Sequence, residues 1–215
     1  MSRPTAILFD LDGTLVDSRP AIVGGLNATL RALGEPERAE AELVPRIGPP
    51  IHETWAWLLG RPGDEVEDVV AAYRERYLST MLDGTLVYDG VPEVLDRLSA
   101  DGHRLGVATS KTQSAAVAIL EHLGLARHFA TIRGPVPPSV EDKAVTVARA
   151  LQALELTTGH GAVLIGDREH DVHGGHAQGL RVLGAAWGYG RPGELEAAGA
   201  KAIAAAPLDL LPLLA

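Results

Sequence analysis

The stretch AILFDLDGT at residues 6–14 decides how the rest of the chain is organised. Its first four residues form an uninterrupted apolar run, which is typical of a short strand buried on both faces of a sheet. Asp10 and Asp12 follow, and alternation along extended backbone points both to the same side. Two carboxylates so close repel each other unless a cation lies between them or one is protonated. Gly13 allows a tight turn beside them. A plain strand followed by an Asp-Gly turn would give the same pattern.

The composition predicts a globular protein of the cytoplasm. The 215 residues are 46% hydrophobic and 22% charged, with a formal net charge of −9 and no cysteine. We see no signal-peptide pattern and no apolar run near the roughly 20 residues that a membrane helix needs, so we expect no membrane partner. Without cysteine, disulfides, thiolate metal sites and cysteine nucleophiles are excluded. The acidic charge argues against a nucleic acid polymer as partner but allows a small anionic substrate, because local positive groups can override the overall field.

A long segment after the first strand carries only helical signals. Apolar residues recur at helical spacing in four runs, over residues 20–33, 37–44, 51–59 and 64–78. The sequence PRIGPP at residues 45–50 is too rich in Pro and Gly for regular structure. We therefore predict that residues 17–87 form an inserted all-helical cap domain, which interrupts a core made of residues 1–16 and 88–215.

Strands and helices alternate after this insert. We expect strands at 105–108, 131–132, 162–165 and 181–186, and helices at 92–100, 112–123, 142–154 and 171–178. This alternation predicts an α/β fold with a Rossmann-like, doubly wound parallel sheet. The tail from Glu194 has a helical composition, and two prolines limit the length of its helices.

Polar groups follow the later strands as well. Thr109 and Ser110 come after the second core strand, where hydroxyl and amide groups can hold phosphate oxygens, although Thr-Ser is also a common helix cap. Lys143 lies in a first helical turn, where the helix dipole disfavours a cation, so it has either another role or simple exposure. Asp167 and Asp171 follow a further apolar strand. In open α/β sheets ligands bind beyond the carboxyl ends of the strands, which is where these groups emerge.

The motif that begins at Asp10 resembles the first motif, Asp-x-Asp-Gly-Thr, of the haloacid dehalogenase superfamily in its phosphatase branch. All four fixed positions are met. The resemblance implies that Asp10 is the nucleophile and Asp12 the general acid/base, with Mg²⁺ between them. Dehalogenases and phosphonate hydrolases of the superfamily lack the second aspartate. The resemblance therefore favours phosphatase or phosphomutase chemistry.

The same resemblance implies roles for the groups that follow the later strands. Thr109 corresponds to the second motif, with Ser110 as an amide donor beside it, and Gly13 is placed with them at the phosphate. Lys143 corresponds to the lysine of the third motif, which neutralises the nucleophile and the phosphate. Many relatives have Lys-Pro where this chain has Lys-Ala. Lys111 is the alternative for that role.

The sequence GDREHD at residues 166–171 resembles the acidic fourth motif, Gly-Asp-x-x-x-Asp. The resemblance implies that Asp167 binds Mg²⁺ directly and that Asp171 does so directly or through water. Asp10 and the main-chain carbonyl of Asp12 would complete the ligands. Carboxylate and carbonyl oxygens are the hard ligands that Mg²⁺ prefers.

Histidines offer a rival interpretation of this region. A zinc site could be built from His170, His173 and His176, with His160 nearby. However, a spacing of three residues drifts around a helix, so the three cannot share one face well. Surface or supporting positions are the preferred interpretation of these residues.

The resemblance covers almost the whole chain and implies a substrate class. It is closest to the phosphoglycolate phosphatase-like group with a helical, C1-type cap, and IGPP at residues 47–50 and GDREHD also resemble members described as 5′-nucleotidases. We expect a monomer or homodimer acting on a small phosphorylated metabolite, phosphoglycolate-like or a nucleoside 5′-monophosphate. Arg46 could bind a second anionic group, or be an ordinary solvated arginine. The alternatives are a sugar phosphomutase of the beta-phosphoglucomutase type and a non-catalytic relative that binds phosphorylated ligands.

Overall fold

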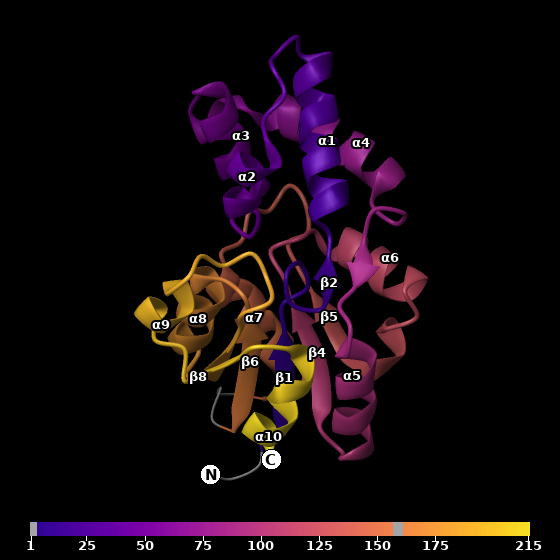
Figure 1. The fold of residues 1–215 in the computed structure, drawn as a ribbon, viewed down its shortest axis with the longest axis vertical. Coiled ribbons are helices and arrows are strands. Elements are labelled where there is room, and N and C mark those ends of the chain that lie inside the picture. Colours follow the sequence, from indigo (N-terminus) through magenta and orange to yellow (C-terminus); the bar gives the residue numbers. More distant parts are fainter. Residues whose placement is uncertain (1–3, 157–160) are drawn as a thin grey trace.

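The computed structural model describes residues 4–156 and 161–215, and its main sheet has six parallel strands (Figure 1). The strands are β1 (Ala6–Phe9), β4 (Arg104–Ala108), β5 (Phe129–Arg133), β6 (Ala162–Gly166), β7 (Arg181–Ala185) and β8 (Ala202–Ala204). Their spatial order is β5-β4-β1-β6-β7-β8. The chain thus winds outward from the central β1 in both directions, and the predicted doubly wound α/β class is confirmed.

Helices cover both faces of this sheet. They are α5 (Val91–Ala100), α6 (Gln113–His122), α7 (Lys143–Ala153), α8 (Glu169–Ala177), α9 (Glu194–Ala198) and α10 (Leu210–Leu214). One hydrophobic cluster joins the sheet to α5, α6 and α10. A second joins the opposite face to α7, α8 and α9. The core is therefore a sheet between two helical layers.

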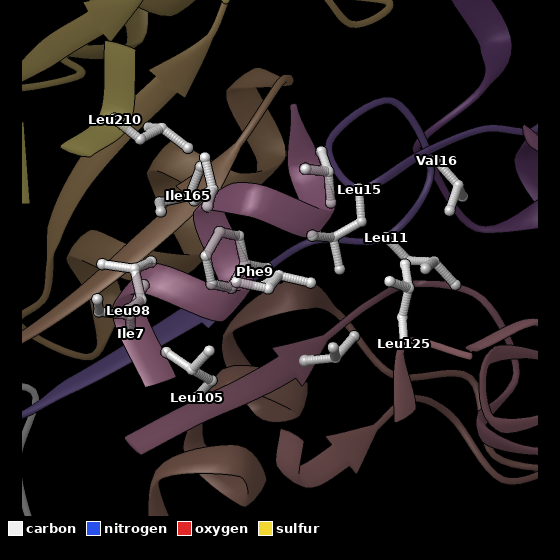
Figure 2. Packing of buried hydrophobic residues seen from close by; sticks show 14 of the residues in the cluster. Ile7, Phe9, Leu11, Leu15, Val16, Leu98, Leu105, Leu125, Ile165 and Leu210 are labelled. Carbon is white, nitrogen blue, oxygen red and sulfur yellow. The ribbon is translucent and has the colours of Figure 1, made fainter. Parts of the chain in front are cut away.

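The apolar run of β1 is explained by these two layers. Ile7 and Phe9 belong to the cluster with α5, where Figure 2 shows them beside Leu98. Ala6 and Leu8 belong to the cluster with α7 and α8. All four side chains of β1 are at most 1% exposed. Full burial of a large apolar side chain is worth about 1.5–3 kcal/mol, so this strand contributes on both sides and leaves no place for polar alternation.

The helical insert, residues 19–80, lies beyond the end of β1 that leads to Asp10 (Figure 1). Its elements are α1 (Arg19–Ala32), α2 (Glu40–Leu43), the 3₁₀ turn η1 (Val44–Arg46), α3 (Ile51–Leu59), the 3₁₀ turn η2 (Gly63–Glu65) and α4 (Glu67–Thr80). They share a hydrophobic cluster around the fully buried Trp55, which also takes in Ala115 and Ile119 of α6. The insert therefore has its own core and also packs on helix α6.

A short antiparallel pair joins the insert to the core. It consists of β2 (Val16–Asp17) and β3 (Leu86–Val87), paired Val16 with Val87 and Asp17 with Leu86. The segment that leads into the insert and the segment that leads back to the core are therefore adjacent.

Some local expectations were wrong. The predicted helix at 37–44 shortens to α2, and η1 falls in the segment expected to be irregular, because Pro45 fits the first turn of a 3₁₀ helix. The tail adds the edge strand β8, which pairs with β7 and in which alanine, a residue depleted in strands, fills two of the three positions. Within 4–156 and 161–215, no helix is long and apolar enough to cross a bilayer.

Candidate active site

Asp10 and Asp12 leave the end of β1 on the same side. The amide of Asp10 donates to the carbonyl of Ile165 at 2.8 Å, which continues the pairing of β1 with β6. Leu11, between the two aspartates, is completely buried in the core. Asp10 and Asp12 instead both line a cavity of about 240 Å³ under the helical insert. The strand thus delivers two carboxylates to one space.

Lys143 is a buried counter-ion for this site. Its Nζ lies 2.7 Å from Oδ1 of Asp10 and 2.6 Å from Oδ1 of Asp171. Burial alone would lower the pKa of Lys143, but the two carboxylates outweigh it and hold the pKa above its usual value. The first turn of α7 is capped by Asp142, whose Oδ1 accepts from the amide of Val145 at 2.9 Å. Lys143 is therefore charged and turned into the site.

Asp12 has a different set of partners. Nζ of Lys111 lies 3.1 Å from its Oδ2, and the hydroxyl of Ser18 donates to its Oδ1 at 2.5 Å. Nζ of Lys111 also donates to the hydroxyl of Tyr77 in α4 at 2.6 Å. The two lysines that the sequence offered for one role thus serve different aspartates. Ser18 and Tyr77 were not identified from the sequence.

Three buried carboxylates form a compact acidic group. Oxygens of Asp10, Asp167 and Asp171 lie within 4.8 Å of one another. Burial raises the pKa of Asp10 to about 6, against the lowering effect of the Lys143 ammonium. Burial and then the charges of Asp171 and Asp10 raise the pKa of Asp167 well above its ordinary value. These carboxylates are costly to ionise together, and a hard cation would relieve that cost, so the donor set fits Mg²⁺.

The histidines do not join this group. Within residues 4–156 and 161–215, the metal-competent cluster contains aspartates only, so the zinc alternative has no support from His170, His173 or His176. His160 lies outside the described residues.

Asp167 is held firmly by its neighbours. The amide of Tyr189 donates to its Oδ2 at 2.7 Å, and the hydroxyl of Thr14 donates to its Oδ1 at 3.3 Å. Gly13, at φ +85°, packs against the same carboxylate, and a Cβ there would lie 2.3 Å from Oδ2. The glycine is therefore needed for backbone conformation and for close approach. Nothing in the sequence pattern pointed to Tyr189 as a donor to this site.

Thr109 and Ser110 lie at the end of β4, beside the aspartates. Thr109 is buried and its hydroxyl accepts from the amide of Lys111 at 3.2 Å, while Ser110 is half-buried. Both line the cavity with Asp10 and Asp12. The predicted phosphate-binding groups of β4 therefore face the same space as the two aspartates.

The helical insert closes the other side of the cavity with cations and aromatic rings. The side chains there include Arg46, His52, Arg74, Tyr73 and Tyr77. The Arg46 guanidinium lies 4.3 Å from the ring centroid of Trp57, within the range of a cation–π contact. The chain as a whole is acidic, yet the arginines Arg46 and Arg74 of the insert line this cavity, which suits an anionic ligand.

Comparison with known proteins places this geometry in a family. Residues 7–185 match the family model described as haloacid dehalogenase-like hydrolase. The tyrosine-protein kinase PtkA of Mycobacterium tuberculosis is 38% identical over 190 residues, which cover 87% of this chain but only 64% of that protein. A 5′-nucleotidase of Pseudomonas aeruginosa is 37% identical over 191 residues, covering 89% of this chain and 86% of that enzyme. The chain thus spans less than two thirds of the length of PtkA.

A solved structure of the same family has the same fold as this chain. A hydrolase of the haloacid dehalogenase-like family from Streptococcus pneumoniae superimposes with a TM-score of 0.92 and 30% sequence identity, over the full length of both chains. The similarity covers the six-stranded sheet and the helical insert together.

Proposed function

The chain belongs to the haloacid dehalogenase-like hydrolase family, and from that premise we propose that it is a phosphatase of small phosphomonoesters. We infer that the reaction runs through an aspartyl-phosphate on Asp10. The observation that supports this best is the separate surroundings of two neighbouring carboxylates. Asp10 is paired with Lys143, whereas Asp12 is held by Ser18 and Lys111. Such a difference suits two different roles in one reaction.

Asp10 is proposed as the nucleophile. Lys143 keeps a positive charge 2.7 Å from its Oδ1, which favours the ionised carboxylate needed for attack on phosphorus. The hydroxyl of Thr109 and amides near Ser110 would hold the phosphoryl oxygens as their charge develops. The attack forms a bond from a carboxylate oxygen of Asp10 to phosphorus and breaks the bond from phosphorus to the ester oxygen, which leaves as the alcohol once it is protonated.

Asp12 is proposed as the general acid and base. Its carboxyl would give a proton to the leaving oxygen in the first step and take one from the attacking water in the second. The water breaks the aspartyl-phosphate and returns Asp10 and inorganic phosphate. Ser18 and Lys111 would keep the carboxyl of Asp12 turned toward the leaving group.

Mg²⁺ is the proposed cofactor. Asp10, Asp167 and Asp171 would hold it, together with the main-chain carbonyl of Asp12, and the buried, mutually repelling carboxylates support this choice. When bound, the ion supplies positive charge that neutralises phosphoryl oxygens.

Residues 17–87 are proposed to act as a cap domain over a core made of residues 1–16 and 88–215. The cavity between the two would take the part of the substrate beyond the phosphate, where Arg46 is proposed to bind a second polar or anionic group. A phosphoglycolate-like compound or a nucleoside 5′-monophosphate is the proposed substrate class. A cytoplasmic monomer or homodimer, without nucleic acid or membrane partners, stays a prediction.

Hydrolysis of a panel of phosphorylated metabolites by the purified chain, with and without Mg²⁺, tests this function. We expect phosphate release that depends on Mg²⁺ and stops on chelation. Conversion of one sugar phosphate into its isomer without release would instead identify a phosphomutase. Binding of phosphorylated compounds without turnover would identify a non-catalytic relative.

A further inference from the structure

Arg168 is a buried arginine that the proposed chemistry does not use. It follows Asp167 directly, and its Nε donates to Oε1 of Glu194 at 2.7 Å. The two side chains are only 4% and 5% exposed. The Glu194 carboxylate also accepts from the amides of Glu169 and Arg191, both at 3.0 Å. This carboxylate is thus fixed within the core, and it anchors the guanidinium of Arg168 there.

The free edge of the same guanidinium reaches the helical insert. Nη1 donates to the carbonyl of Ile47 and Nη2 donates to the carbonyl of Pro45 at 3.4 Å. Gly48 packs against it, and a Cβ at that residue would lie 3.1 Å from Nη1. Hydrogen bonds from a charged donor are about twice as strong as neutral ones. Arg168 therefore ties residues 45–48, which we term the roof segment, to the core.

Arg46 is in the middle of the roof segment. Its carbonyl accepts from the hydroxyl of Thr54 at 3.1 Å, so the carbonyls of residues 45, 46 and 47 all have partners. The Arg46 side chain lines the cavity and lies over the ring of Trp57. The backbone contacts therefore fix the point from which the exposed side chain of Arg46 extends to the cavity.

We propose that Arg168 is a positioning residue for substrate selection, which acts by holding Arg46 in place over the cavity. This inference rests on the phosphatase function proposed above and extends it to a residue outside the reacting groups. An arginine is required because its planar fork can serve Glu194 and two carbonyls at once, which the single ammonium of a lysine cannot. The amide of Arg168 also donates to Oδ2 of Asp171 at 3.0 Å, so the segment after β6 holds two carboxylates of the acidic group as well as the arginine that contacts the roof segment.

The test compares kcat/KM for two kinds of substrate with Mg²⁺ present. One is para-nitrophenyl phosphate, which offers little beyond its phosphate, and the other is the better substrate of phosphoglycolate and a nucleoside 5′-monophosphate. Arg46→Ala and Arg168→Lys should each lower the ratio of metabolite to aryl phosphate about tenfold, through a higher KM. Combining them should lower it no further, because Arg168 acts through Arg46.

Arg191→Lys is the matched control. Arg191 also pairs with Glu194, at 3.7 Å, but its side chain is 71% exposed and the roof segment is not among its partners. We expect its ratio to equal that of the wild type. Equal losses on both substrates, or additive losses in the double variant, would show that Arg168 is merely structural and would overturn the proposal. Wild-type protein without aryl phosphate hydrolysis would instead overturn the function on which it rests.

Two further measurements test the proposal if Arg168→Lys folds poorly. Gly48→Ala disturbs the same contact from the insert side, and it should reproduce the ratio of Arg168→Lys. Hydrogen exchange needs no substrate, and the amide of Ile47, which donates to the carbonyl of Val44 at 3.0 Å, should exchange at least about tenfold faster in Arg168→Lys than in Arg191→Lys. Unchanged exchange and an unchanged ratio would both contradict the proposed link.

Discussion

The ammonium group of Lys111 lies 3.1 Å from Oδ2 of Asp12, and it is shared with the hydroxyl of Tyr77 in the helical insert. The contact links the proposed general acid to α4. The side chain of Lys111 is 8% exposed, and although loss of solvent alone would lower its pKa, Asp12 and Tyr77 hold that pKa above the usual value. The lysine therefore keeps its charge throughout the neutral range, and its loss should affect proton transfer more than binding.

Lys111→Met should lower kcat by about 10–100-fold on alkyl phosphates, because the carboxyl of Asp12 loses the group that orients it. The loss should be much smaller on para-nitrophenyl phosphate, whose leaving group needs no proton. Steady-state kinetics on both substrates measure this difference. Tyr77→Phe, which removes only the hydroxyl at 2.6 Å, serves as the milder companion variant. Equal losses on the two substrates would show that Lys111 does not act through Asp12.

Asp10→Asn should abolish turnover while the protein stays folded, because the proposed nucleophile is gone. Asp12→Asn should turn over very slowly but still form some aspartyl-phosphate from para-nitrophenyl phosphate. Rapid quench followed by intact-protein mass spectrometry detects the added phosphoryl group. Circular dichroism checks the fold of both variants. A folded Asp10→Asn protein with near-normal rates would rule out the covalent route.

Mg²⁺ should stabilise the protein more at neutral than at acidic pH. Because burial raises the pKa of Asp10 from 3.8 to about 6, the folded metal-free protein takes up a proton as pH falls through about 6. Mg²⁺ needs the carboxylate form, so its affinity falls over the same range. The increase in Tm with Mg²⁺ should be large near pH 7.5 and small near pH 5. An increase that does not change with pH would exclude Asp10 as a ligand.

The raised pKa of Asp10 has the opposite effect on the metal-free protein, whose stability it increases at acidic pH. A carboxyl whose pKa is raised on folding contributes stability below about pH 4, and this contribution is lost as pH rises through about 6. Asp10→Asn should remove that part of the pH dependence. Chemical denaturation of wild type and variant without Mg²⁺, at several pH values, gives the free energies of unfolding to compare.

Gly13→Ala should destroy the acidic group, whereas Gly34→Ala should not. Both glycines have positive φ, +85° and +77°, so each substitution costs about 1–2 kcal/mol of backbone strain. Only at Gly13 does the added Cβ collide with a carboxylate, that of Asp167 at 2.3 Å, while at Gly34 nothing lies within 4 Å. We expect Gly13→Ala alone to lose activity and the Tm increase with Mg²⁺. Activity in Gly13→Ala equal to that in Gly34→Ala would contradict the close packing.

The fold could be predicted because its signals are local. The apolar run of β1, the alternation of later strands and helices, and the absence of strand patterns in the insert can each be seen within a few residues of sequence. The confirmed sheet follows from these signals and from the parallel order that they require. β8 was missed because it is only three residues long, two of them alanine, and it gains its conformation from pairing with β7 at the sheet edge.

The supporting contacts of the site could not be predicted in the same way. Ser18 lies six residues from Asp12, but whether its hydroxyl turns to that carboxylate depends on where β2 leads the chain. The amide of Tyr189 meets Asp167 across 22 residues, and Arg168 meets the carbonyl of Ile47 across 121. Such pairs are set by tertiary packing and leave no spacing in the sequence. The roles of the candidate residues stay predictions until the variants are measured.

The pairing of β2 with β3 makes the helical insert a closed detour from the core. Because Val16 lies opposite Val87, the two points of departure and return are neighbours whatever is threaded between them. An inserted segment of another length or sequence can be joined to the core at Val16 and Val87 without altering the order of the six strands. A library of chimaeras that exchange this segment among relatives would therefore vary the ligand preference while Asp10, Lys143 and the acidic group stay on the core, and Ser18 and Tyr77, the partners of Asp12 and Lys111, would have to be retained in each insert.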